Sequence, residues 1–97
     1  MYLEIVSPEA TLLSTEVDSV VVPGVNGEFE MLKNHAPIIS ILKAGTIKIN
    51  THTQNHLVFD ELHADVIPHK DDKKVLTVKI NSGTIEMKDN KLIILAD

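Results

Sequence analysis

The chain has 97 residues, enough for one domain with a modest core and too few for a second. Its 9 basic and 14 acidic residues give a net charge of −5, and an acidic chain without a basic cluster is a poor ligand for nucleic acid or an anionic membrane surface. Aromatic residues make up only 3% of the chain, and the lack of cysteine excludes disulfides and thiolate metal sites.

The N-terminal residues do not follow the pattern of an export signal, because no basic stretch precedes a long apolar run. The longest apolar runs, such as Leu92–Leu95, are far shorter than the roughly 20 residues that a membrane span needs. We therefore expect a protein that is made and used in the cytoplasm without export.

Apolar and polar residues alternate along most of the chain, which is the period of β-strands with one buried face. The predicted inward positions are Leu3 and Ile5, Ile47 and Ile49, Leu76, Val78 and Ile80, and Ile85 and Met87. Two further runs, Val20–Val22 and Leu92–Leu95, contain no polar residue. We expect them to be strands that are covered on both faces.

Turn-forming residues separate these runs at short intervals. They occur at Ser7-Pro8, Pro23-Gly24, Asn26-Gly27, Ala44-Gly45 and Asn81-Ser82-Gly83. Asp89-Asn90 lies between two further runs and has the length of a tight hairpin loop. Short strands with frequent turns predict an all-β sandwich or barrel.

The stretch from Asn34 to Gly45 suits two structures. Asn34 could cap a helix that has Pro37 in its first turn and ends at Gly45. The β-branched pair Ile38-Ile39 favours a strand instead.

Residues 51–74 form an irregular, polar stretch that holds four of the five histidines. We expect an extended hairpin here, with strands at Leu57–Phe59 and Ala64–Ile67, the second ending at Pro68.

The histidines invite a test for a metal site. His52 and His56 are four residues apart, but threonines around them disfavour a helix, and on a strand the two would be about 13 Å apart. His63, Asp65 and His69 could join them only by folding together. We therefore expect surface histidines, no metal, no cofactor and no catalytic residue.

One stretch is more specific than any of these patterns. It begins with Gly27-Glu28, continues with His35-Ala36-Pro37 and an apolar run, and ends with Lys43-Ala44-Gly45. Together with Val17–Gly24 and the final Leu95-Ala96-Asp97, it resembles the N-terminal β-sandwich domain of the epsilon subunit of the rotary (F-type) ATP synthase. Two features depart from that family: residues 51–74 are longer and more polar, and Ser82-Gly83 replaces a frequent Gly-Gly pair.

The resemblance implies a flattened sandwich of two antiparallel sheets with about eight to ten short strands. The domain would span residues 1–97, with 51–74 as a polar hairpin insertion, and the stretch that follows Asn34 would be a strand and not a helix. Many members of the family have a C-terminal helical hairpin that can inhibit ATP hydrolysis. Because the sequence ends at Asp97, we expect a short form without that hairpin.

The resemblance also implies a function. Proteins of this family are non-catalytic rotor subunits that bind the gamma subunit and rest on the polar loops of the c-ring. The protein would then lie at the cytoplasmic face of a bacterial inner membrane, held there through the complex. The alternative is a free-standing β-sandwich binding module, which the few aromatic residues, Tyr2, Phe29 and Phe59, do not favour.

The resemblance places a partner interface at Glu28, Phe29, Met31, His35 and Pro37. Glu28 corresponds to a position that contacts the c-ring, and we expect His35 at the same end of the sandwich. The Ala-Pro pair that follows His35 stiffens the chain there and gives its ring a defined direction.

Overall fold

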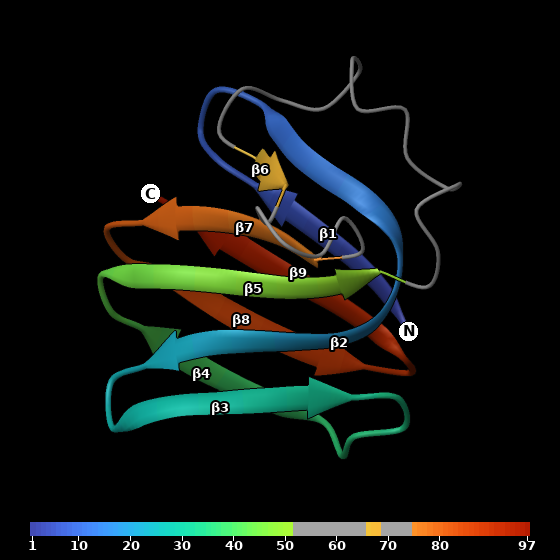
Figure 1. Ribbon diagram of the computed structural model, residues 1–97. Coiled ribbons are helices and arrows are strands. Elements are labelled where there is room, and N and C mark those ends of the chain that lie inside the picture. Colours follow the sequence, from blue (N-terminus) through green and yellow to red (C-terminus); the bar gives the residue numbers. More distant parts are fainter. Residues whose placement is uncertain (52–65, 69–74) are drawn as a thin grey trace.

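The computed structural model describes residues 1–51, 66–68 and 75–97. These ranges contain nine strands and no helix, which confirms the all-β prediction (Figure 1). Accordingly, this part of the chain has no helix that could span a membrane. The strands are β1 (Tyr2–Val6), β2 (Thr11–Gly24), β3 (Gly27–Leu32), β4 (Ile38–Leu42), β5 (Gly45–Thr51), β6 (Val66–Pro68), β7 (Val75–Ile80), β8 (Gly83–Lys88) and β9 (Lys91–Ala96).

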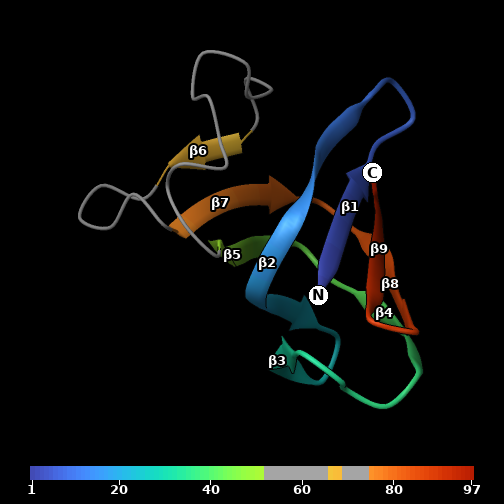
Figure 2. The same cartoon turned by 90° about the vertical axis from the view of Figure 1, so that its right-hand side faces the viewer.

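The strands form two layers that share one long strand (Figure 2). Hydrogen bonds join them in the order β1-β9-β8-β4-β2-β5-β7-β6, with β3 on the other side of β2. The first half of β2 pairs with β1, where Leu13 lies opposite Ile5, and its second half pairs with β5 and β3. The layers β1-β9-β8-β4 and β3-β2-β5-β7-β6 therefore face each other as a sandwich.

One strand pairing departs from the expected antiparallel sheets. β1 and β9 run parallel, with Leu3 opposite Leu92 and Ile5 opposite Ile94. A hairpin can join only antiparallel neighbours, whereas these two strands are joined by nearly the whole chain. The other pairings between described strands are antiparallel.

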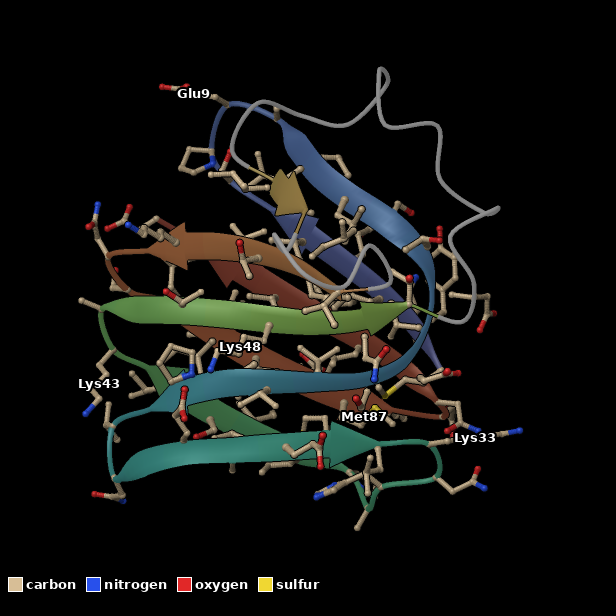
Figure 3. All side chains as sticks on the ribbon, viewed as in Figure 1. Glu9, Lys33, Lys43, Lys48 and Met87 are labelled. Atoms are coloured by element: carbon tan, nitrogen blue, oxygen red, sulfur yellow. The ribbon has the colours of Figure 1, made fainter. Side chains whose placement is uncertain are left out.

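The core is aliphatic and follows the predicted alternation. The nine predicted inward side chains are all buried: Leu3, Ile5, Ile47, Ile49, Leu76, Val78, Ile80, Ile85 and Met87. Figure 3 shows Met87 among the core side chains, while Lys33 and Lys43 mark opposite ends of the sandwich. Burial of this side of each strand from water is the main favourable term in folding.

The prediction of two strands covered on both faces is wrong. In β9, Leu92 and Ile94 are buried, but Ile93 is half-buried and Leu95 is 54% exposed. In β2, Val20 and Val22 are buried and Val21 is half-buried. Each of these strands belongs to one of the two layers of the sandwich, so only one of its faces packs against the core. Every second residue therefore faces away from the core, whatever its hydrophobicity.

The predicted hairpin at Asp89-Asn90 is confirmed. Asp89 has φ 53° and Asn90 has φ 60°, the left-handed pair of a type I′ turn. That turn matches the twist of the flanking strands, and Asp and Asn accept its backbone conformation more readily than most residues.

The stretch after Asn34 is a strand, and the helical alternative is wrong. In β4, Leu42 is buried, whereas Ile39 is 78% exposed and Ile41 is 63% exposed. This two-residue alternation arises because β4 pairs with β8 along its whole length, with Ile39 opposite Glu86 and Ile41 opposite Thr84.

Much of the predicted 51–74 hairpin, including Leu57–Phe59, His52, His56, His63, Asp65 and His69, lies outside the described residues. Within the described part, β6 pairs with β7 and ends at Pro68, next to the predicted end of the second strand.

Candidate partner interface

The five predicted interface residues lie on β3 and in the loop that follows it, but they do not form one patch. Glu28 follows the β2–β3 turn, whereas His35 and Pro37 lie in the loop that leads from β3 to β4 (Figure 1). A strand of six residues spans about 17–20 Å, so the two groups occupy opposite ends of β3. The expectation that Glu28 and His35 share one end of the sandwich is wrong.

Glu28 is an exposed carboxylate beside a tight turn. The turn residues Val25 and Asn26 are followed by Gly27 at φ 124°, a left-handed backbone that favours glycine. A hollow of about 310 Å³ opens here, lined by Glu28, Phe29, Ser40 and the turn residues. The half-buried Phe29 packs its ring against Gly24, where an added Cβ would lie 2.7 Å from the ring.

Met31 cannot contact a partner in this fold. It is fully buried and lies opposite Val20 on the inner side of the sheet. Glu28, Glu30 and Leu32 take the outward positions of β3 instead. Met31 therefore belongs to the core, and its assignment to the interface is corrected.

The loop of residues 33–37 presents His35 to solvent. The His35 backbone N–H donates to the Leu32 carbonyl at 3.1 Å, and its ring Nδ1 lies 2.7 Å from the Ala36 carbonyl oxygen. Ala36 and Pro37 are exposed as well. The loop is therefore a compact turn with an accessible histidine ring.

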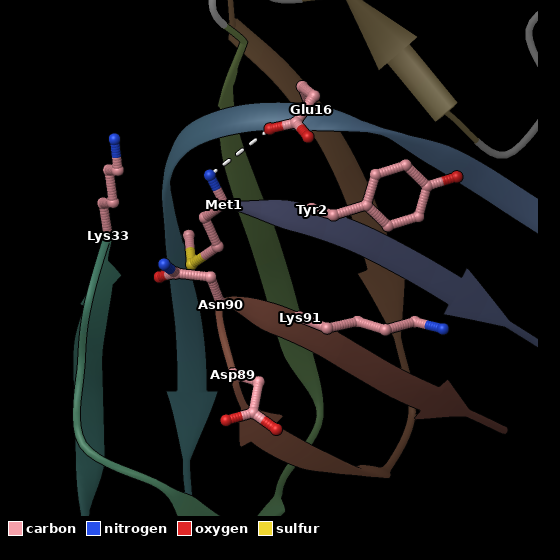
Figure 4. A pocket seen from close by; sticks show the side chains of 7 residues that line it. All are labelled: Met1, Tyr2, Glu16, Lys33, Asp89, Asn90 and Lys91. Atoms are coloured by element: carbon pink, nitrogen blue, oxygen red, sulfur yellow. Dashed lines mark hydrogen bonds and ion pairs between the residues drawn. The ribbon is translucent and has the colours of Figure 1, made fainter.

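A second hollow, of about 520 Å³, lies beside this loop (Figure 4). Its lining mixes both signs of charge: Glu16 and Asp89 against Lys33, Lys91 and the Met1 amine, which is 3.4 Å from Glu16 Oε2. Such a mixture gives no strong preference for an anionic or cationic small ligand.

The outer side of the β1-β9-β8-β4 layer carries several exposed aliphatic side chains, which sequence reasoning missed. Ile39, Ile41 and Leu95 are more than half exposed, and Ile93 and Val6 are half-buried. The pairing registers place them in neighbouring rows, since Leu95 lies opposite both Thr84 and Val6, and Thr84 lies opposite Ile41. We call these five residues the aliphatic face.

The outer side of the other layer mixes polar and apolar residues, with Leu32 on β3 and Ile67 on β6 52% and 56% exposed. Its exposed residues include Glu28 and Glu30 on β3, Lys48 and Asn50 on β5, and Lys79 on β7. On the β1-β9-β8-β4 side, the outward residues Thr84 and Glu86 of β8 separate the isoleucines of β4 from Ile93 and Leu95 of β9. Exposed aliphatic surface is a typical feature of protein interaction sites.

The described residues offer no arrangement for metal chemistry. Within 1–51, 66–68 and 75–97, no group of three or more histidine, cysteine, aspartate or glutamate residues could hold a metal ion. The fold and surfaces define a small β-sandwich domain that exposes several aliphatic side chains on the β1-β9-β8-β4 layer.

Comparison with known proteins identifies the family. Residues 1–60 match the model of the ATP synthase delta/epsilon chain, beta-sandwich domain. The chain is 39% identical over all 97 residues to the ATP synthase epsilon chain of Campylobacter curvus, of which it spans 60%. It is 32% identical over 95 residues to that of Chlorobaculum tepidum, covering 98% of this chain and 86% of the relative.

The fold agrees with that result. A chain in the cryo-EM structure of the Tetrahymena thermophila mitochondrial ATP synthase central stalk and c-ring superposes with a TM-score of 0.69, at 13% identity, covering 99% of this chain and 62% of that one. The chain belongs to the delta/epsilon β-sandwich family of ATP synthase subunits, as its Gly27–Gly45 stretch indicated. Its curated relatives are ATP synthase epsilon chains.

Proposed function

We propose that this chain joins the gamma subunit to the c-ring in the central stalk of an ATP synthase and so couples ion translocation to ATP synthesis. Its membership of the epsilon-chain family supports a place in this membrane-associated complex. The similar Tetrahymena chain belongs to a structure of the central stalk and c-ring, which supports the choice of partners. In a bacterium, the subunit would lie at the cytoplasmic face of the inner membrane.

The aliphatic face is the observation that carries this proposal, and we assign it to the gamma subunit. Ile39, Ile41 and Leu95 expose 78%, 63% and 54% of their surface on one side of the sandwich. Complete burial of an aliphatic side chain contributes roughly 1.5–3 kcal/mol, so three of them are a substantial part of an interface. His35 and Pro37 precede β4 directly and would extend the same contact.

Glu28 and the β2–β3 turn would meet the polar loops of the c-ring. They lie at the end of β3 away from His35, so the gamma subunit and the ring could be contacted together by different parts of the domain. A packed sandwich between the two contacts resists deformation and can transmit torque.

The proposal is tested by co-elution of this chain with the gamma subunit from the same source on a sizing column. We expect a one-to-one complex that Ile39→Ser weakens by about 10-fold or more, because an apolar contact is lost. Lys48→Ala, on the outer side of the other layer, is the control and should leave the complex unchanged. If two folded proteins elute separately, the free-standing binding module becomes the better interpretation.

A further inference from the structure

The loop of residues 33–37 crosses from one layer to the other, and two asparagines connect it to the β8–β9 hairpin. The Asn34 backbone N–H donates to Asn90 Oδ1 at 2.7 Å. The Asn90 side-chain amide in turn donates to Asn34 Oδ1 at 2.8 Å. These reciprocal bonds join residues 56 positions apart in the sequence.

The backbone holds Asn90 in place independently of this pair. The Asn90 carbonyl accepts a hydrogen bond from the Tyr2 N–H at 2.9 Å, which connects the hairpin turn to the start of β1. Figure 4 shows the Asn90 side chain beside Met1, directed toward the segment that carries Lys33. Asn90 is therefore a fixed support, and the loop is the part that gains order from the contact.

The backbone conformation of both residues explains why asparagine suits these positions. Asn34 has φ 65° and Asn90 has φ 60°, in the left-handed region that asparagine tolerates better than most side chains. Glycine would accept the same backbone but would offer no amide. Glycine variants can therefore remove the side-chain bonds without straining the turn.

We infer that Asn34 and Asn90 are positioning residues that preset the loop carrying His35 for its protein partner. This inference rests on the proposed function and adds which residues prepare the interface. A loop that is ordered before binding loses less conformational entropy in the complex, so affinity rises without a new contact.

The first measurement is amide hydrogen exchange in the isolated protein, followed by NMR. Asn90→Gly removes both bonds and should speed exchange of the Asn34 amide by about three- to tenfold. Asn34→Gly removes only the side-chain pair and should have a smaller effect, and Asn34→Asp, which keeps the acceptor oxygen, should restore it. Asp89→Gly is the control, because Asp89 has a similar left-handed backbone in the same turn.

The second measurement is affinity for the gamma subunit. Asn90→Gly should weaken binding by about three- to tenfold while urea denaturation shows a folded domain, and Asp89→Gly should bind like the wild type. Faster exchange with unchanged affinity, or unchanged exchange, overturns the inference. If the wild type itself does not bind gamma, the proposed function fails, and the exchange result alone decides whether the asparagines preset the loop.

Discussion

At the residue scale, the direction in which a side chain points decides whether it is buried or available to a partner, more than its chemical type does. Met31 and Glu28 both occupy β3, yet one is fully buried and the other is exposed at the end of the sandwich. Neighbouring strand residues point to opposite sides of a sheet, so residues in one motif can have unrelated roles. Glu28 is the predicted interface residue that offers a charge to a partner at the β2–β3 end.

The role of Glu28 can be tested without disturbing the fold. Glu28→Gln should lower ATP-driven ion pumping in reconstituted vesicles by about two- to fivefold, the range expected for one exposed ionic contact. The melting temperature should change by less than about 2 °C, because the side chain is exposed. Glu30→Gln is the control, since Glu30 is an exposed acid on the same strand. Normal pumping by Glu28→Gln would remove the assignment.

At the element scale, the five residues of β4 have two roles: some side chains pack in the core, and others are exposed to a partner. Leu42, at its end, is 1% exposed and pairs with both Gly83 and Gly24, which connects the two layers. Ile39 lies opposite Glu86 in the pairing of β4 with β8, and its side chain points outward. The strand therefore supports the core with one side and forms part of the aliphatic face with the other.

This division predicts different costs for similar truncations. Leu42→Ala should lower the free energy of unfolding by about 2–5 kcal/mol, because it leaves a cavity in the core. Ile39→Ala should lower it by less than about 1 kcal/mol, since only an exposed strand position changes. Urea denaturation measures both values. Equal losses would mean that Ile39 also packs in the core.

At the scale of the whole molecule, the sandwich depends on contacts between distant parts of the chain. β9 lies between β1 and β8, so the last strand is internal to its layer. It contributes Leu92, Ile94 and Ala96 to the core. Without β9, both β1 and β8 would lose a pairing partner.

Removal of residues 91–97 should therefore unfold the domain. The deletion takes away two large core side chains, at about 2–5 kcal/mol each, and both of their strand pairings, against a total stability of about 5–15 kcal/mol. Far-UV circular dichroism and NMR dispersion measure the loss. Asp97→Ala, which removes only the hydrogen bond from Ser82 Oγ at 3.1 Å, should keep the native spectrum. A dispersed spectrum for the deletion would show that β9 is dispensable.

The sequence by itself determined the nine inward residues of β1, β5, β7 and β8 and the Asp89-Asn90 turn, because alternation and turn chemistry act between near neighbours. Its Gly27–Gly45 stretch also indicated the family. Only the tertiary structure decided that β1 and β9 run parallel, that Glu28 and His35 lie at opposite ends of β3, and that outward aliphatic residues of β1, β4 and β9 lie on the same side of the sandwich. Strand pairing joins residues far apart in the chain, and no local pattern specifies which outward side chains become neighbours.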